Sequence, residues 1–404
     1  METIRIAAAA LKTNKLRSFL TLLGVIIGVM TVVSVVSIIA GLNSYISEKV
    51  FQLNPDVYVV TQFGIITSRE QFLEAIKRRK LDWSDYQLVK QRCRTCDLVG
   101  ASLATRQATK RGPKRLAGVR IQGSTANMAE INNLDLESGR FFTDPENHHS
   151  AMVAVIGSDV RDELFAKLDP LGRIMWIGDQ PVRVVGLLRK QGSVLGQSQD
   201  NQLFIPVNAF RKRFGTRRSL DLFVRAAGGV PGVPTSMDDI RTIIRGRRKT
   251  GFRADDPFAV VSAEALQNVW KNVSAGMFAL MTFISSISLV VGGIVITNIM
   301  LVSVVERTRE IGIRRALGAT KRNIQLQFLT ESIMLALGGG VAGVLLGIII
   351  SKTISTVFPL PTLVRPSLVL AGLGIAAFTG ILAGFIPARR AANLPPVDSL
   401  RYES

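Results

Sequence analysis

Four long stretches of this 404-residue chain contain no aspartate, glutamate, lysine or arginine. They run from Ser18 to Ser47, from Asn272 to Val305, from Ser332 to Ser351 and from Pro366 to Ala388. Each is long enough to supply the roughly 20 apolar residues that cross a ~30 Å hydrocarbon core. One such stretch could be a buried core helix, but four of them separated by charged segments predict four membrane-spanning helices.

The first stretch follows Lys12, Lys15 and Arg17, as the apolar part of a secretory signal peptide would. Its apolar core extends from Phe19 to Leu42, which is longer than the roughly 7–15 residues of a cleavable signal. We therefore expect a retained anchor over residues 18–47. A cytoplasmic amphipathic helix over residues 1–17 is expected to precede it.

Basic residues in the short loops predict the orientation of the spans. Residues 306–331 contain six lysines and arginines, whereas the loop of residues 352–366 contains two. We therefore expect residues 306–331 and both termini, including the tail of residues 389–404, in the cytoplasm. The predicted location is the cell (inner) membrane, and residues 48–262 are expected outside.

This outer segment predicts a mixed α+β domain. Short β-like runs alternate with turn residues between positions 98 and 225, and helical patterns cover residues 69–92, 158–168 and 237–248. The predicted fold class is thus a membrane α-helical protein with four transmembrane helices. A large α+β extracytoplasmic domain is inserted between helices one and two.

The segment between the first two spans is basic. Residues 48–271 contain 35 of the 50 basic and 24 of the 30 acidic residues, so their net charge is +11. A basic surface attracts anionic lipid headgroups, acidic partners or anionic substrates. The alternative is a well-solvated basic domain, and the location outside the membrane disfavours nucleic acid as a partner.

The second span is expected to be longer than the membrane is thick. Ser262 is a plausible helix N-cap, and no proline interrupts the chain from there to Val305. About 43 helical residues would measure roughly 64 Å at 1.5 Å per residue, twice the hydrocarbon core. Residues 263–305 are therefore predicted to form a stalk as well as a span, and residues 18–47 to accompany them. Residues 332–351 and 367–388 are predicted to form the third and fourth spans.

The composition of the spans disfavours ion-coupled transport and a polar pore, because intramembrane charges mark ion pathways and proton relays. Small residues instead recur at four-residue spacing, which lets helix backbones approach closely. We expect packing surfaces, within one subunit or between subunits, at Gly24, Gly28, Gly339, Gly343, Gly347, Gly372, Gly380 and Gly384.

Two cysteines, Cys93 and Cys96, lie in the outer segment with C-x-x-C spacing. Without a second cysteine pair a four-ligand zinc site is disfavoured, and no metal site is expected. A local disulfide in an oxidising compartment is the preferred interpretation.

The cytoplasmic segment of residues 306–331 is the most densely patterned part of the chain. Its first half reads as a short charged helix ended by Gly318, with Thr320 capping the next helix. Charges of both signs surround Ile311, Ile313 and Leu317. The segment is either a membrane-surface anchor or a docking element for a cytosolic partner.

At this segment the chain resembles the permease subunits of MacB/FtsX-type ABC transporters, the mechanotransmission class. The resemblance extends over nearly the whole chain and rests on motifs that occur in the family's order around four spans. They are Asn14 to Val29, Gly139-Arg140-Phe141-Phe142, Val155-Ile156-Gly157, Leu164-Phe165 with Asp169 to Gly172, Val184 to Gly186, Glu306 to Ala319, Ile386 to Ala392 and Pro395 to Arg401.

The resemblance implies a dimer of permeases, homomeric or heteromeric, bound to cytosolic ABC ATPase subunits. ATP-driven motion would pass to the outer domain instead of moving a substrate through the bilayer. The residues implied to seat the ATPase are Glu306, Arg307, Arg309, Glu310, Ile311, Gly312, Arg314, Arg315, Leu317 and Gly318.

MacB-type exporters often carry a fused ATPase, but this chain contains no G-x-x-x-x-G-K-[ST] phosphate loop. We therefore expect no enzymatic activity and no bound cofactor here, with ATP and Mg²⁺ on a separate partner chain. Export of drugs, peptides or lipids with a periplasmic adaptor is the preferred function. The alternatives are lipoprotein release, FtsX-like control of cell-wall hydrolases, and a structural anchor or sensor without an ATPase.

Overall fold

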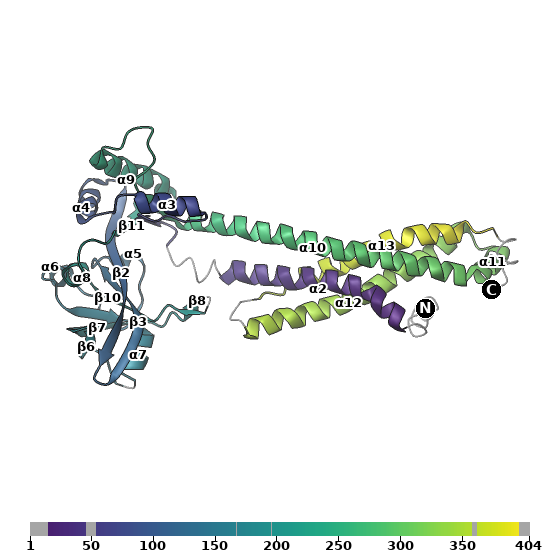
Figure 1. Cartoon of the computed structure of the whole chain (residues 1–404), viewed down its shortest axis with the longest axis horizontal. Coiled ribbons are helices and arrows are strands. Elements are labelled where there is room, and N and C mark those ends of the chain that lie inside the picture. The colour runs from purple at the N-terminus through teal and green to yellow at the C-terminus, as the bar shows by residue number, and fades with distance from the viewer. Residues whose placement is uncertain (1–14, 46–53, 167, 195, 358–361, 396–404) are drawn as a thin grey trace. The chain divides into compact units, whose positions relative to one another are not determined.

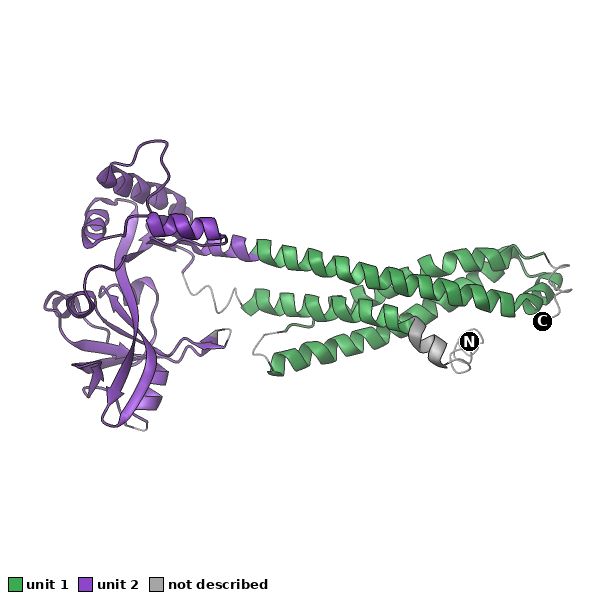
Figure 2. Ribbon diagram, in the orientation of Figure 1, with its two compact units in different colours: residues 1–46, 271–404 green, residues 47–270 purple. Residues whose placement is uncertain are grey.

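The computed structural model describes residues 15–45, 54–166, 168–194, 196–357 and 362–395 (Figure 1). Contacts divide the chain into two compact units, residues 1–46 with 271–404, and residues 47–270 (Figure 2). The amphipathic helix predicted for residues 1–17 lies outside the described residues except for the last three, which belong to helix α2.

The outer unit is built on a mixed β-sheet. Among its described residues, ten strands pair in the order β12-β1-β11-β2-β3-β10-β5-β7-β4, and β6 pairs with both β2 and β7. Because β6 joins these two strands, the pairings β2-β3-β10-β5-β7-β6 form a closed ring. The strands are β1 (Val57–Thr61), β2 (Cys96–Arg111), β3 (Lys114–Ser124), β4 (Leu136–Gly139), β5 (Val153–Ile156), β6 (Ile174–Ile177), β7 (Gln180–Leu188), β10 (Gln202–Pro206), β11 (Asp221–Ala226) and β12 (Ala259–Ser262), with a separate hairpin of β8 (Ser193–Val194) and β9 (Gln197–Ser198).

Strand β2 belongs to both parts of the sheet. Its first half, up to Ser102, pairs with β11, and its second half, from Ser102, pairs with β3. Thr109 and Lys110 near its end also pair with β6. One strand of 16 residues therefore ties the ring to the β12-β1-β11 extension.

Seven α-helices accompany the sheet in the described part of this unit. The helical pattern predicted for residues 69–92 is two helices, because Asp82 caps a second one: the backbone N–H of Asp85 donates to Asp82 Oδ1 at 2.9 Å. The predicted helix of residues 158–168 ends early, at Leu164, and the one of residues 237–248 begins earlier, at Val233. The helices are α3 (Arg69–Lys77), α4 (Trp83–Arg92), α5 (Met128–Ile131), α6 (Asp144–His148), α7 (Ser158–Leu164), α8 (Val207–Phe214) and α9 (Val233–Arg248).

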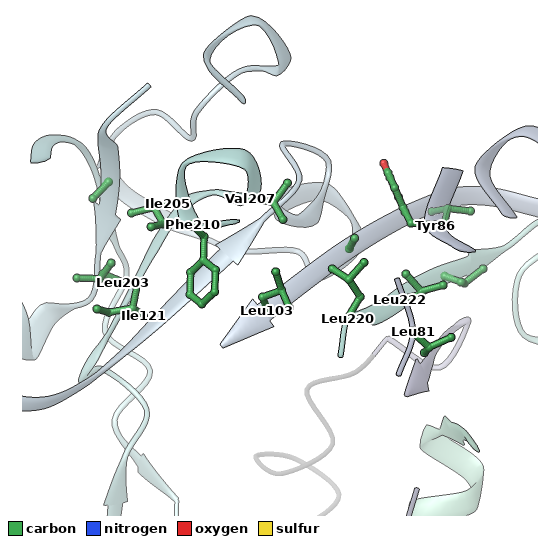
Figure 3. Close-up of a cluster of buried hydrophobic side chains, with 14 of the residues drawn as sticks. Leu81, Tyr86, Leu103, Ile121, Leu203, Ile205, Val207, Phe210, Leu220 and Leu222 are labelled. Atoms are coloured by element: carbon green, nitrogen blue, oxygen red, sulfur yellow. The ribbon is translucent and has the colours of Figure 1, made fainter. Parts of the chain in front are cut away.

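The core of the outer unit lies between the sheet and the helices that cover it (Figure 3). Leu103, Ile121 and Leu203 of β2, β3 and β10 are almost fully buried there. Phe210 of α8 packs directly on Gly123 of β3, where an added Cβ would collide with the phenyl ring. A glycine inside the strand thus lets the helix approach the sheet closely.

A bidentate ion pair holds the entry to α6. Arg140 Nη1 and Nη2 donate to the two carboxylate oxygens of Glu146 at 2.8 and 2.7 Å, and Glu146 accepts from the Thr143 backbone N–H at 2.8 Å. These hydrogen bonds, first of all those from Arg140, lower the pKa of Glu146 from 4.5 to about 2. The ionised carboxylate therefore stabilises this turn above pH 4.5, and that contribution is lost as the pH falls toward 2.

Replacing Glu146 with glutamine should remove this pH dependence. Because partly exposed ion pairs contribute about 0.2–1 kcal/mol, we expect Glu146→Gln to lower local stability around α6 by up to about 1 kcal/mol at pH 7 and to have little effect near pH 2. Hydrogen exchange of the α6 amides between pH 7 and pH 2 measures this. An equal effect of the substitution at every pH would contradict it.

Four helices among the described residues are long and apolar enough to cross a membrane, and they belong to the other unit except for residues 263–270. They are α2 (Lys15–Tyr45), α10 (Ala263–Glu306), α12 (Lys321–Val357) and α13 (Pro366–Ala392), and the short helix α11 (Thr308–Ala316) connects α10 to α12. The predicted fold class is confirmed.

Two of these helices extend beyond the predicted spans. Helix α12 covers residues 321–357 instead of 332–351, and α13 continues past residue 388 to Ala392 with Pro387 inside it. A charge-free stretch predicts only the part of a helix that lies in hydrocarbon. The helix itself continues into the aqueous region until a capping or helix-breaking residue ends it. Helix α10 begins directly after Ser262, as predicted, and its 44 residues measure about 66 Å.

The glycines predicted to pack helices lie at helix crossings. A Cβ on Gly24 of α2 would be 2.6 Å from the Gly292 Cα of α10, and one on Gly343 of α12 would be 2.8 Å from the Ile26 carbonyl oxygen of α2. The contacts of the remaining predicted positions are Gly28 with Leu289 of α10, Gly339 with Leu22 and Val25 of α2, Gly347 with Val33 and Met30 of α2, Gly372 with Val33 and Val29 of α2, Gly380 with Ala336 and Ile333 of α12, and Gly384 with Ser332 of α12.

Enlarging a glycine at a crossing should separate the helices. For Gly343→Val we expect a loss of about 1–3 kcal/mol, since the new side chain must displace the α2 backbone. Gly338→Val on the same helix is the matched control, because nothing lies within 4 Å of its Cβ position. Thermal unfolding followed by size-exclusion chromatography distinguishes them, and equal midpoints for both variants would contradict this packing.

Candidate functional site

Helix α11 packs its buried face against the ends of α12 and α13. Ile311 is 3% exposed and packs in the cluster that contains Ile324 and Phe328 of α12 and Ala388 of α13. Gly312 beside it is also buried. The side-chain hydroxyl of Thr308 donates to the Val305 carbonyl oxygen at 2.9 Å at the start of the helix.

Two arginines hold α11 against α12 and α13. Arg315 Nη1 donates to the carbonyl oxygens of Ala392 and Leu394, both at 3.0 Å, at the end of α13. These carbonyls belong to a helix terminus, where the last backbone acceptors have no partner within the helix. Arg307 Nη1 lies 3.3 Å from Glu331 Oε1 of α12, and both side chains are largely buried.

The opposite face of α11 points outward. Arg309, Glu310 and Arg314 are exposed, as is 43% of Ile313 and 83% of Leu317. A pocket of about 460 Å³ opens between this face and α12, with Glu310 and Arg314 in its wall. The surface therefore combines apolar side chains with charges of both signs.

The end of α11 is set by Gly318, whose φ of +101° is in the region that favours glycine. The Ala319 backbone N–H donates to the Arg314 carbonyl oxygen at 3.0 Å, which satisfies a terminal acceptor. Thr320 then caps α12 by accepting from the Asn323 N–H at 3.2 Å. The helix, the stop and the cap lie at the residues the sequence predicts.

Comparison with known proteins identifies the family. The MacB-like periplasmic core domain matches residues 18–243, more than half of the chain, and the FtsX-like permease C-terminal domain matches residues 282–396. The uncharacterized ABC transporter permease YknZ of Bacillus subtilis is 31% identical over 100% of this chain and 99% of its own length. The chain belongs to the MacB/FtsX-like family of ABC transporter permeases.

Other relatives are longer than this permease. The macrolide export ATP-binding/permease protein MacB of Bdellovibrio bacteriovorus is 34% identical over 97% of this chain, which spans 60% of that relative. Among solved structures, the periplasmic region of MacB from Actinobacillus actinomycetemcomitans aligns with 56% of this chain and 98% of its own, with 16% identity and a TM-score of 0.46.

The residues of this permease that were predicted to contact the ATPase divide into two groups. Ile311, Gly312, Arg307 and Arg315 hold α11 in place, and Gly318 ends it. The exposed ones are Arg309, Glu310, Arg314 and Leu317, joined by Ile313. Of these, Arg314 also helps to hold α11, because its Nη1 donates to Gln327 Oε1 of α12 at 2.7 Å. Glu306 is exposed at the end of α10 and has interactions of its own.

A second surface at the end of α13 was missed. Phe385 and Ile386 are 48% and 55% exposed and lie beside Arg389 and Arg390 in a pocket of about 490 Å³. The sequence signal for this surface is an apolar pair followed by two arginines, within a motif that otherwise supports only the family resemblance. Arg315 connects this helix end to α11.

Cys93 and Cys96 form a disulfide between the end of α4 and the start of β2. The Thr95 hydroxyl between them donates to Asp239 Oδ2 of α9 at 3.0 Å. The bridge thus lies in the outer unit at a junction of two helices and a strand. No group of three or more metal-ligating side chains is present among the residues that the structure describes.

Removing the Arg315 guanidinium should loosen the end of α13. For Arg315→Met we expect the amides of Asn393 and Leu394 to exchange about tenfold faster, because a hydrogen bond from a charged group contributes about 1.5–3 kcal/mol. Hydrogen exchange measures this. Arg309→Met, on the exposed face of the same helix, is the control. Unchanged exchange in Arg315→Met would show that the Arg315 hydrogen bonds do not stabilise the end of α13.

Proposed function

We propose that this permease transmits the ATP-driven motion of a separate ABC ATPase to its extracytoplasmic domain, and that the ATPase docks on the exposed face of α11. The observation that carries the proposal is the division of α11 into a fastened face and an exposed face. Ile311 and Arg315 fix the helix to α12 and α13, while Ile313, Arg314 and Leu317 remain accessible. A docking element must combine these properties, since a loose helix would absorb the movement of its partner.

The composition of the exposed face fits a protein partner better than a lipid surface. Arg309 and Arg314 would favour anionic lipid, but Glu310 lies between them, and charge pairs of both signs give register to protein interfaces. The exposed Leu317 supplies an apolar anchor of the kind that fills a partner's pocket. The second surface, at Phe385 and Arg389, would extend the same interface.

Helix α10 supports transmission to the outer domain. It begins at Ala263, directly after β12, and ends at Glu306, with one residue between it and α11. The described helix is continuous over that length. A continuous helix resists bending, so a displacement at the α11 end is passed along it instead of being absorbed in a loop.

We further propose that two permease copies, identical or different, act with two ATPase subunits in the inner membrane, with both termini cytoplasmic. ATP and Mg²⁺ would bind the ATPase chains. Export of drugs, peptides or lipids with a periplasmic adaptor is the preferred work, supported by relatives that are named macrolide exporters. Macrolide susceptibility of a deletion strain tests the drug cargo: an unchanged inhibitory concentration would exclude macrolides and leave export of peptides or lipids, lipoprotein release and hydrolase control.

Charge removal on the exposed face should uncouple the partner. The permease is co-purified with its ABC ATPase, reconstituted in vesicles and assayed for ATP turnover. For the double variant Arg309→Ala with Glu310→Ala we expect the stimulation of turnover by the permease to fall at least tenfold, because docking contacts are lost while Arg314 keeps its hydrogen bond to Gln327 of α12.

The matched control is Arg69→Ala with Glu70→Ala, which removes the same charges from the exposed helix α3 of the outer domain. It should retain full stimulation. Unchanged stimulation in the α11 variant, with the complex still assembled, would show that the ATPase does not couple through this face.

A further inference from the structure

A pocket of about 470 Å³ in the outer unit has an unusual lining. Seven of its thirteen lining residues are asparagine or glutamine, and three are apolar. Sites for drug-like molecules are lined mostly by apolar and aromatic side chains. This pocket therefore suits a ligand that presents many hydrogen-bonding groups and little apolar surface.

The floor of the pocket is formed by side chains on one face of the sheet. Gln122 of β3 and Gln202 of β10 lie there, and Gln122 Nε2 donates to Gln202 Oε1 at 2.7 Å. Each amide has both a donor and an acceptor group. Among the described residues this single bond leaves the Gln122 oxygen and the Gln202 nitrogen without a protein partner. Phe223 of β11 adds a half-buried aromatic ring.

One wall is the segment after α5, where Asn133 adopts a positive φ of +47°. Its amide donates to Asn54 Oδ1 at 3.1 Å, and Asn54 Nδ2 donates to the Ile131 carbonyl oxygen at 3.0 Å. The neighbouring Asn132 has no such bond from its side chain in the part of the chain that the structure describes. The wall is thus fixed while Asn132 keeps its hydrogen-bonding capacity.

The other wall is held by Asp200, which is 2% exposed. Its carboxylate accepts from the backbone N–H groups of Gln191 and Gly192, both at 2.8 Å. The Arg189 N–H donates to the Asp135 carbonyl oxygen at 2.9 Å and joins the two walls. The site is therefore preorganised, which lowers the entropic cost of binding.

The charges of the lining and the strand pairings around the pocket limit the class of ligand that it can bind. Asp135 at the rim is matched by Arg189 at 3.3 Å, and the exposed Lys190 adds one further positive charge to the lining. The lining therefore disfavours a cationic ligand, while its seven amides favour a ligand with many hydrogen-bonding groups. An extended peptide would need a free strand edge for main-chain hydrogen bonds, but β3 pairs with β2 and β10, and β10 also pairs with β5. Hydroxyl groups on a sugar ring need only side-chain amides, and its C–H face can contact an aromatic ring.

We propose that this pocket binds a neutral saccharide, through the amides of Gln122, Gln202 and Asn132. The site is independent of coupling at α11, because binding requires neither ATP nor an ATPase. Failure of one proposal therefore leaves the other untouched. The saccharide could be free or part of a larger molecule, and a soluble oligosaccharide probes the shared chemistry.

The test uses the full chain in lipid nanodiscs, which avoids sugar-headed detergents. Chitotetraose, maltotetraose and cellotetraose are titrated by calorimetry and by saturation-transfer NMR, alongside tetra-alanine with blocked ends. We expect saturable binding of at least one saccharide and none of the peptide. Gln122→Leu with Gln202→Leu should weaken that binding at least tenfold, and Asn132→Ala several-fold.

Gln180→Leu, an exposed amide on β7 outside the pocket, is the matched control and should bind as the unaltered chain does. Circular dichroism and size-exclusion chromatography establish that each variant is folded. Asn132→Ala tests the wall of the pocket independently of the two floor substitutions. The proposal is overturned if none of the three saccharides binds, if the floor and wall variants bind as well as the control, or if the peptide binds instead.

Discussion

The close approach of helix backbones at glycine is the contact on which the membrane unit depends. In hydrocarbon, apolar side chains gain nothing by leaving lipid for one another, so helices must associate by fitting closely. Gly343 and Gly347 bring α12 against the backbone of α2, and Gly380 and Gly384 bring α13 against α12. Ser34 adds a hydrogen bond from α2 to the Gly347 carbonyl oxygen at 3.1 Å.

This packing also explains why α11 can be held so firmly. Its seat is made of the ends of α12 and α13, and those ends have a fixed separation because the glycine contacts lie one or two turns away. Ile311 fills the apolar space between them, and Arg315 satisfies carbonyls that the end of α13 leaves unpaired. A short helix with few contacts of its own thereby acquires a defined orientation.

The sequence was most informative where a single physical rule acts alone. Absence of charge predicted the spans, and Gly318 and Thr320 predicted the end of α11 and the start of α12, because both are local effects. The partner of each glycine was not predictable: Gly292 completes the crossing with Gly24 but belongs to no long stripe of small residues. The ring closed by β6 and the amide pocket also escaped prediction, because both join residues far apart in sequence.

The bond from Arg315 to the last carbonyls of α13 has a consequence for engineering chimeric permeases. A segment exchanged between relatives to change partner choice would conventionally be cut at the loop, around residues 306–320. Here the loop and residues 392–394 form one mechanical part, so a graft of the loop alone would place a foreign helix on a native terminus. The transferable cassette is α11 together with the end of α13.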